Sequence, residues 1–203
     1  MQKKENKQKL IEELKTKVQE CKECPLGEYR LNPCFGNGSY HAELMFVGEG
    51  PGYDEDHQGE VFVGRAGKLL DRILDKVLGL KRKNVFITNI VKCHPMKDPL
   101  HPNKRGNDRP PSEEEANICS GLYLINQIKL IKPRIIVTLG STATKVMLDT
   151  QKGITRSRNK VYNKTYDDFE VKLVCTYHPA YLLRFPAKKK EEFEDFKLIR
   201  SLL

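Results

Sequence analysis

The sequence predicts an α/β protein, built as a three-layer α/β/α sandwich around a four-stranded parallel sheet. Four short apolar runs alternate along the chain with stretches whose apolar residues recur at helical spacing. This alternation is typical of parallel strands with helices on both faces of the sheet. The four runs are almost continuously apolar, which is expected for strands that are covered on both faces.

The first half of the chain contains two of these predicted strands. Residues 3–20 are expected to form a helix, because apolar residues between Leu10 and Val18 recur at helical spacing among Lys and Glu. Residues 43–48 and 84–91 read as strands, and the amphipathic stretch 66–78 between them reads as a helix. Residues 95–111 are rich in Pro, Asn, Lys and Gly and are expected to form a long loop.

The second half repeats the same pattern. Residues 112–131 are expected to be helical, and Ser112 followed three residues later by Glu115 predicts a capping box at the start. Residues 134–139 and 171–177 are the third and fourth predicted strands, and further helices are expected at 141–150 and 188–203. There is no internal repeat or linker, so residues 1–203 are expected to form one domain.

Composition narrows the class of protein. The chain has 203 residues, 38% of them hydrophobic and 31% charged, and a formal net charge of +9. This excludes a disordered chain, and no apolar run is long enough to span a bilayer. The Lys-rich start is not followed by the apolar segment of a secretory signal, so a cytoplasmic protein without a membrane partner is expected. The positive charge favours a polyanionic partner such as nucleic acid, although many cytosolic proteins are basic without binding one.

Several candidate site residues follow the predicted strands, where open α/β sheets bind their ligands. The first strand leads into Gly48-Glu49-Gly50-Pro51-Gly52, which lacks the pattern of a phosphate-binding or dinucleotide-binding loop and therefore disfavours ATP and NAD. Asn89 lies in the second strand and is either a buried amide satisfied by the backbone or a reader of a base. His178 follows the fourth strand and precedes a proline.

Phe62 lies in the segment 61–67, which leads into the helix predicted from residue 66. It has two readings, as a core residue or as a platform on which a flat base stacks.

The six cysteines suggest a metal site. A cytosolic chain is kept reduced, so a disulfide framework is not expected. The C-x-x-C pair Cys21 and Cys24, together with Cys93 and Cys119, makes a plausible four-thiolate site, and the spacing does not distinguish zinc from an iron–sulfur cluster. Cys175 lies in an apolar strand and reads as a core residue, and Cys34 has no assigned role.

Taken together, GEGPGYDED, VFVGRAGKLLD, TNIVKC, the four cysteines and HPAYLLR resemble the family 4 uracil-DNA glycosylases, over about residues 21–196. The resemblance implies a four-stranded parallel α/β/α sandwich with a structural [4Fe–4S] cluster held by Cys21, Cys24, Cys93 and Cys119. It also implies an enzyme of base excision repair that removes uracil from DNA and leaves an abasic site.

The resemblance assigns roles within a pocket. A flipped uracil would stack on Phe62, and Asn89 would pair with uracil O4 and N3–H. His178 would donate a hydrogen bond to uracil O2, and the backbone N–H groups around Gly50 would add others. Glu49 and Glu55 are the carboxylates that would face the sugar cation or orient water. Tyr53 and Glu55 are the candidates for excluding the methyl group of thymine.

DNA contacts are expected in two further segments. Tyr181, Leu182, Leu183 and Arg184 resemble a loop that wedges into the duplex. The basic stretch 152–164, with Arg156 and Arg158, is either a solvated loop or a phosphate contact. The segment 96–105 lengthens the interval between Cys93 and Cys119 and reads as a surface loop, an added DNA contact or a lid on the cluster.

Three functions follow from these observations. The first is a monomeric uracil-DNA glycosylase acting on uracil-containing DNA. The second is a non-catalytic iron–sulfur module of the same fold that binds nucleic acid. The third is a zinc-stabilised hydrolase of nucleotides, which the lack of a catalytic metal constellation outside the four cysteines disfavours.

Overall fold

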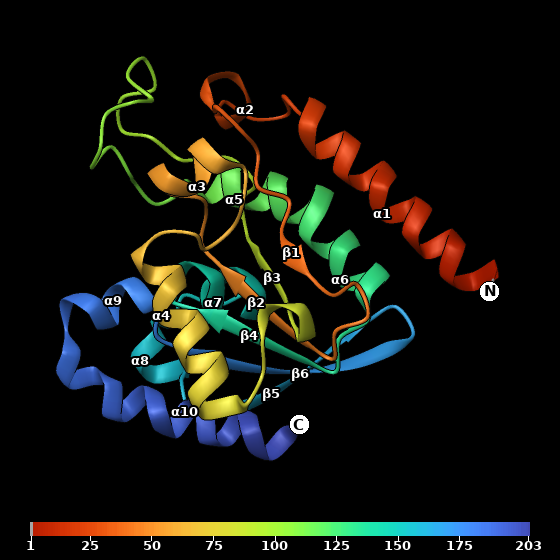
Figure 1. Cartoon of the computed structure of the whole chain (residues 1–203), viewed down its shortest axis with the longest axis vertical. Helices are drawn as coiled ribbons and strands as arrows, with labels where there is room; N and C mark the ends of the chain where they lie inside the picture. Colours follow the sequence, from red (N-terminus) through yellow and green to blue (C-terminus); the bar gives the residue numbers. More distant parts are fainter. Residues whose placement is uncertain (1) are drawn as a thin grey trace.

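The computed structural model describes residues 2–203, with side chains described from residue 5 onward. A single six-stranded sheet runs through the middle of the molecule, and helices lie over both of its faces (Figure 1). The strand order is β1-β3-β2-β4-β6-β5. The strands are β1 (Asn37–Gly38), β2 (Leu44–Gly48), β3 (Phe86–Asn89), β4 (Ile135–Leu139), β5 (Val161–Tyr166) and β6 (Phe169–Thr176).

The prediction of an α/β fold is confirmed, but the sheet is mixed and has two strands more than predicted. Neighbouring strands β3, β2, β4 and β6 run parallel, whereas β1 and β5 pair antiparallel at the two edges. All residues of β2, β3 and β4 are buried, as expected for strands that helices cover on both faces.

The edge strand β5 was missed because its sequence is polar and half-exposed. Val161, Asn163 and Thr165 are exposed, so β5 lacks the apolar run of a central strand. It joins β6 through the two-residue turn Asp167–Asp168, with Asp167 at φ +50° as such tight hairpins require. Residues 152–164 are therefore not one basic loop, because they contain the short helix α8 and the start of β5.

The helices form two layers with a hydrophobic core under each. Helices α1, α5, α6 and α7 share one core with Met45 and Val47 of β2, and helices α4, α9 and α10 share the other with Leu44 and Phe46. The α-helices are α1 (Gln2–Glu20), α2 (Leu26–Tyr29), α3 (Tyr53–Gln58), α4 (Arg65–Ile73), α5 (Glu113–Cys119), α6 (Ile125–Ile131), α7 (Ser141–Leu148), α8 (Ile154–Ser157), α9 (Pro179–Arg184) and α10 (Lys189–Leu202).

The long predicted helices are present, with a local change in two of them. A π-helical turn at Leu74–Leu78 extends α4, and another at Ser120–Leu124 joins α5 to α6. The capping box is confirmed, because Glu115 N donates to Ser112 Oγ at 3.1 Å and Ser112 N donates to Glu115 Oε2 at 2.7 Å. The short helices α3 and α9 were not predicted, and both border the site described next.

Candidate active site

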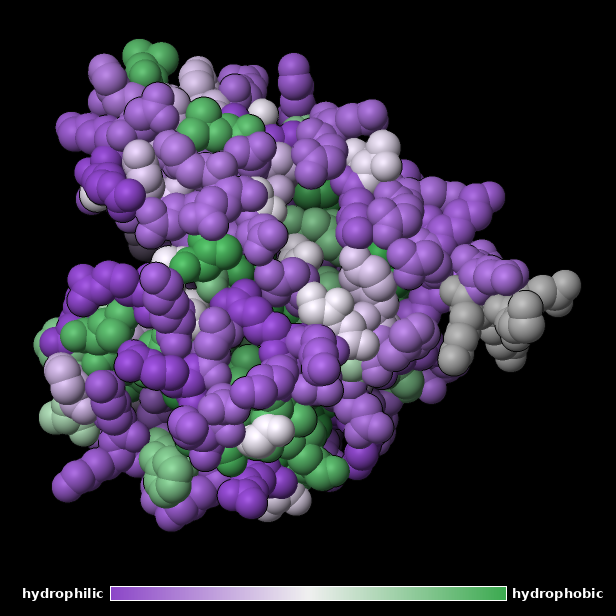
Figure 2. All heavy atoms as spheres, in the orientation of Figure 1, coloured by the Kyte–Doolittle hydropathy of each residue, from purple (hydrophilic) through white to green (hydrophobic). Residues whose placement is uncertain are grey.

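A cleft of about 760 Å³ lies at the carboxyl ends of the parallel strands. In Figure 2 the outline of the molecule is indented on the left, the side toward which the central strands of Figure 1 point. The cleft lining contains the six residues that the sequence assigned to catalysis or base binding: Glu49, Gly50, Glu55, Phe62, Asn89 and His178. These residues come from the ends of β2, β3 and β6 and from the start of α3 and α4, so the fold brings together segments far apart in the sequence.

Asn89 supplies the unsatisfied amide of this cleft. It is the last residue of β3 and only 1% exposed, and its Oδ1 accepts no hydrogen bond from the residues that the structure describes. A buried amide oxygen without a partner costs about 1–3 kcal/mol. Since Asn89 borders the cleft, a ligand N–H is the natural partner for this oxygen.

The position of Asn89 depends on Lys92, which sequence reasoning missed. Lys92 is fully buried, and its Nζ donates to Asn89 O at 2.7 Å, to Thr88 Oγ1 at 2.8 Å and to Gln127 Oε1 at 2.8 Å. Burial lowers the pKa of Lys92 to about 8. The three acceptors hold the end of β3 in place beneath the cleft, although a lysine in an apolar run carries no sequence signal of such a role.

Phe62 provides a flat apolar wall beside this amide. Its backbone has φ +54°, a left-handed conformation that is uncommon outside glycine. Arg82 holds the segment by donating to Val61 O at 3.0 Å and to Phe62 O. Gly67 is required below it, since a Cβ there would lie 1.6 Å from Phe62 O. Gly48 is required as well, because its Cβ would lie 2.7 Å from Phe62 Cζ and 2.4 Å from Asn89 Oδ1.

His178 faces the same space as a neutral hydrogen-bond donor. Its ring centroid lies 5.6 Å from that of Phe62. Burial, together with the smaller effect of the nearby positive charge of Arg184, lowers the pKa of His178 to about 4. The N–H of Ala180 donates to His178 Nδ1 at 3.1 Å, so in the neutral ring Nε2 carries the proton. The cleft therefore presents an Nε2–H donor at ordinary pH.

The two candidate carboxylates differ in their environment. Glu55 Oε1 accepts from the backbone N–H groups of Val63 and Gly64, both at 3.0 Å, and its Oε2 accepts from that of Gly52 at 3.3 Å. These bonds tie α3 to the segment that carries Phe62. The Glu49 carboxylate accepts a hydrogen bond from Thr142 Oγ1 and none from a backbone N–H of the residues that the structure describes. Glu49 is therefore the carboxylate with accepting capacity left for a ligand or water.

Comparison with known proteins identifies the family. Residues 35–198 match the model of the uracil-DNA glycosylase superfamily. The chain belongs to this superfamily. It is 44% identical over 196 residues to the type-4 uracil-DNA glycosylase of Sulfurisphaera tokodaii, covering 95% of this chain and 84% of that protein. It is also 38% identical to the type-4 enzyme of Archaeoglobus fulgidus, covering 95% and 92%, and 39% identical to that of Thermotoga maritima, covering 97% and 96%.

Helix α9 of this uracil-DNA glycosylase superfamily member borders the cleft and divides the predicted wedge residues. Tyr181, Leu183 and Arg184 line the cleft, and the Tyr181 ring stacks on Tyr177 with centroids 5.0 Å apart. Leu182 is 0% exposed and packs in the core with Phe196. Tyr181, Leu183 and Arg184 thus face the cleft, while Leu182 anchors the helix.

The two arginines predicted to contact DNA are also placed differently. Arg156 is exposed at α8. Arg158 Nη2 forms an ion pair with Asp195 at 2.9 Å, and its guanidinium lies 5.0 Å from the centroid of the Tyr177 ring. Arg158 therefore attaches α8 to α10, and only Arg156 of the pair is free to meet a phosphate.

Tyr53 does not line the cleft of this superfamily member. Its ring stacks on His57 with centroids 4.0 Å apart, and the guanidinium of Arg105 lies 4.3 Å from its centroid. Of the two residues predicted to exclude thymine, only Glu55 reaches the cleft wall.

The four cysteines with the predicted ligand spacing line one small cavity, together with Arg30 and Tyr123. Arg30 Nη1 donates to Cys93 Sγ at 3.0 Å, and Lys92 N donates to Cys119 Sγ at 3.3 Å. Burial raises the pKa of Cys93 to about 12 and that of Cys119 to about 11, so these thiols remain neutral unless a cation binds them.

Within residues 2–203, no three Cys, His, Asp or Glu side chains come close enough together to hold one metal ion. Cys175 is 0% exposed in β6, which confirms its prediction as a core residue. Cys34 is also fully buried, and its Sγ donates to Glu55 O at 3.3 Å.

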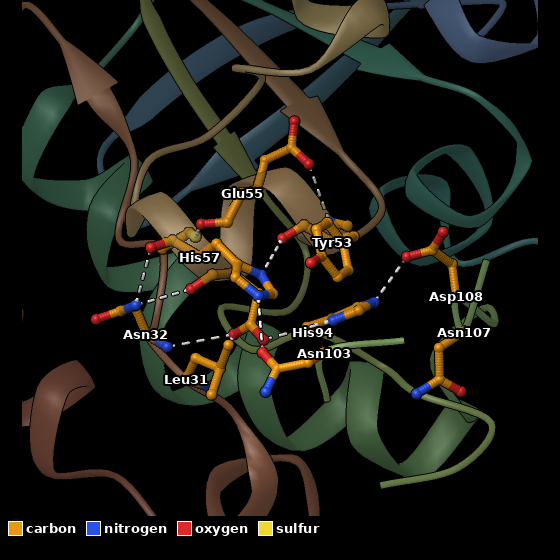
Figure 3. A network of polar contacts seen from close by, with 12 residues as sticks. Leu31, Asn32, Tyr53, Glu55, His57, His94, Asn103, Asn107 and Asp108 are labelled. Carbon is orange, nitrogen blue, oxygen red and sulfur yellow. Dashed lines mark hydrogen bonds and ion pairs between the residues drawn. The ribbon is translucent and has the colours of Figure 1, made fainter. Parts of the chain in front are cut away.

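A second buried network, which sequence reasoning missed, supports the rim of the cleft (Figure 3). The side chain of His94 is 0% exposed and lies between two carboxylates, with Nε2 2.7 Å from Asp108 Oδ1 and Nδ1 3.5 Å from Asp56 Oδ2. Asp56 Oδ1 also accepts from the backbone N–H groups of Leu31 and Asn32. Burial alone would lower the pKa of His94, but the two carboxylates outweigh it and raise the pKa to about 9.

The raised pKa of His94 predicts how the free energy of unfolding depends on pH. A folded pKa of about 9, above the unfolded value of about 6.5, means that the contribution of His94 is fully present below pH 6.5 and is lost as pH rises through 9. His94→Gln is expected to lower the free energy of unfolding by about 3 kcal/mol near neutral pH and by much less above pH 9. Urea unfolding of both proteins across this range measures the difference, and a deficit that stays constant with pH would contradict it.

Among residues 2–203, no helix combines the length and the apolar character that a bilayer crossing needs.

Proposed function

We propose that this chain is a type-4 uracil-DNA glycosylase, a hydrolase that cleaves the N-glycosidic bond of uracil in DNA and leaves an abasic site for base excision repair. The observation that carries the proposal is the buried, unpartnered Oδ1 of Asn89 beside the Phe62 ring and the His178 donor, all in one cleft. The full-length similarity to curated type-4 enzymes supports it.

Base recognition follows from the amide of Asn89. A uracil flipped out of the helix would stack on Phe62, with N3–H donating to Asn89 Oδ1 and O4 accepting from Asn89 Nδ2. Cytosine reverses both groups, since its N3 accepts and its N4 donates. An amide that keeps this orientation would therefore reject cytosine. The Lys92 bond to Asn89 O fixes the backbone from which the amide projects.

Bond cleavage requires stabilisation of two charges. As the C1′–N1 bond breaks, the electron pair moves to uracil, and we propose that His178 Nε2–H donates to O2, where negative charge grows. A water molecule adds to C1′ of the sugar cation, and the proton that it loses neutralises the uracil anion. Glu49 is proposed as the carboxylate that faces this cation and orients the water, because Glu55 is bound to backbone N–H groups.

DNA binding is proposed for the side chains around the cleft mouth. Leu183 would fill the space that the flipped base leaves, with Tyr181 beside it, and Arg184 would contact a phosphate. Arg156, exposed on α8 outside the cleft lining, would contact another. We further propose that residues 1–203 act as one domain and as a monomer.

The test is direct. The purified chain is incubated with an oligonucleotide that contains one uracil and with a matched thymine control, and alkali then cleaves any abasic site. We expect strand scission only in the uracil oligonucleotide. No scission by folded protein that still binds DNA would instead favour the non-catalytic binding module. The presence of Phe62, Asn89 and His178 together argues against that module, because binding alone does not require them.

A structural [4Fe–4S] cluster is proposed at Cys21, Cys24, Cys93 and Cys119. Four thiols around one cavity supply the donors that such clusters use, and a cluster spreads its ligands over several iron atoms rather than one. When bound, the group would join α1 to the loop after β3. It takes no part in the proposed reaction.

The cluster proposal predicts the metal content of two variants. Protein purified without oxygen is expected to contain iron and acid-labile sulfide, to lose both in Cys93→Ala and to keep both in Cys175→Ala, which replaces a core cysteine. The Cys93 variant should also unfold at lower temperature. Stoichiometric zinc without iron would refute the cluster.

A further inference from the structure

The segment 96–108, here called the arm, is an ordered projection beside the cleft. Met96 and Asp108 pair as an isolated β-bridge at its base. Asn107 is only 4% exposed and holds the arm together, since its Nδ2 donates to Asp98 O at 2.7 Å and to His101 O at 3.1 Å, and its Oδ1 accepts from Asp98 N at 2.8 Å. The arm therefore has a defined shape.

The arm is attached to the cleft wall rather than to the cysteine cavity. Arg105 forms an ion pair with Asp54 of α3 at 3.1 Å, and His57 Nε2 lies 3.0 Å from Asn103 Oδ1. The end of the arm leads into the cleft lining through Asp108 and Arg109. No residue of the arm lines the cavity of Cys21, Cys24, Cys93 and Cys119, which argues against a cluster lid.

The exposed tip of the arm combines an apolar residue with positive charge. Leu100 is 76% exposed, the largest exposed fraction among the large hydrophobic residues for which exposure is described. Lys97 and Lys104 are exposed on either side of it. Segment 96–108 holds Lys97, Lys104 and Arg105 against Asp98 and Asp108, a formal net charge of +1 with its histidine neutral, and Arg105 pairs with Asp54 of α3. Lys97 and Lys104 thus leave the arm with a net positive charge.

We propose that the arm is a second DNA-contacting element, opposite α9 across the cleft, in which Lys97 and Lys104 bind phosphates of duplex DNA and Leu100 packs against a base or sugar. The two exposed lysines at the tip favour a polyanion, and the exposed Leu100 between them is placed to pack against the sugar or base of the same ligand. Apolar side chains between cations are a common means of holding deformed DNA. The inference rests on the proposed function for its choice of DNA.

Salt dependence tests the two lysines. Binding is measured by fluorescence anisotropy on a duplex with a tetrahydrofuran abasic analogue, which cannot be cleaved. For Lys97→Ala/Lys104→Ala, the slope of log K against log salt is expected to fall by about 1.8, at roughly 0.9 for each phosphate that the protein no longer neutralises. The control Lys83→Ala/Lys172→Ala removes two exposed lysines outside the cleft lining and should keep the slope. An unchanged slope in the arm variant overturns the proposal.

The role of Leu100 in binding and the excision of uracil are measured in separate experiments. Leu100→Ala should weaken duplex binding about tenfold, whereas Leu122→Ala, which removes a leucine exposed to 42% outside the cleft, should not. Equal effects of the two leucine variants would contradict a role for Leu100. Single-turnover excision of uracil at saturating enzyme should match wild type in all arm variants. If wild-type protein excises no uracil, the proposed function fails, while the anisotropy slopes still decide whether the arm binds DNA.

Discussion

Asn89→Asp is expected to reduce kcat/KM for uracil excision by about 10³-fold. An ionised carboxylate can accept from uracil N3–H but has no N–H to give to O4, so an acceptor faces an acceptor in a buried site. Sites built to hydrogen-bond a polar group discriminate strongly, by 10⁴-fold or more in the best cases. The uracil-to-cytosine ratio of excision rates should therefore fall even where the absolute rates are low.

The measurement compares single-uracil and single-cytosine oligonucleotides with wild type, Asn89→Asp and Asn163→Asp. Asn163 is an exposed residue of the edge strand β5 and controls for the added charge. Discrimination against cytosine that is the same in Asn89→Asp as in wild type would show that Asn89 does not read the base.

His178→Phe is expected to lower kcat by about 10²- to 10³-fold with little change in KM. Phenylalanine keeps a ring against Phe62 but removes the Nε2–H donor, and loss of one such donor to a developing anion has an effect of this size. The control is His41→Phe, which changes an exposed histidine in the turn before β2. A rise in KM with unchanged kcat would assign His178 to ground-state binding instead.

The depressed pKa of His178 adds a pH dependence. Protonation of Nδ1 would break the bond from Ala180 N–H that orients the ring, so the contribution of His178 to kcat should be constant from about pH 5 to pH 8 and change only as pH falls through about 4. A change in kcat near pH 7 that is absent from His178→Phe would mean that the imidazolium is the active species.

The free energy of unfolding should also depend on the protonation of His178 at acidic pH. The unfolded chain binds a proton at His178 below about pH 6.5, whereas the folded chain binds it only below about 4. Wild type should therefore lose about 3 kcal/mol of unfolding free energy, on account of this residue, as pH falls from 6.5 to 4. Thermal or urea unfolding of wild type and His178→Phe gives the difference, and parallel pH profiles would contradict it.

The central strands were predictable from sequence because burial on both faces leaves a continuous apolar run. Val161–Tyr166 gave no such signal, since an edge strand shows one face to solvent, and only the Asp167–Asp168 turn beside an alternating pattern marks it. The short helices α3 and α9 were missed for a different reason, because six residues provide too few turns for helical periodicity to show.

The residues of the cleft were predictable by type, but their partners were not. Asn89 and His178 stand out as polar residues at strand ends and Phe62 as an aromatic residue before a helix, and the structure brings them together. The bonds that hold Glu55, the burial of Leu182 and the pairing of Arg158 with Asp195 depend on side-chain direction and on segments distant in sequence. For the same reason nothing in the sequence distinguished Lys92 and His94, whose acceptors lie on other elements.

The fixed left-handed backbone at Phe62 determines when the stacking surface forms while the enzyme searches DNA for uracil. Arg82 holds the segment of Phe62 without any ligand, and Gly67 and Gly48 leave the space that the segment and its ring occupy, so the stacking surface exists before a base leaves the duplex. A base that leaves the duplex then binds to a preformed pocket. Its binding therefore carries no entropic cost of ordering that pocket. The same rigidity means that released uracil finds an equally complementary surface, so free uracil should compete with damaged DNA for the enzyme.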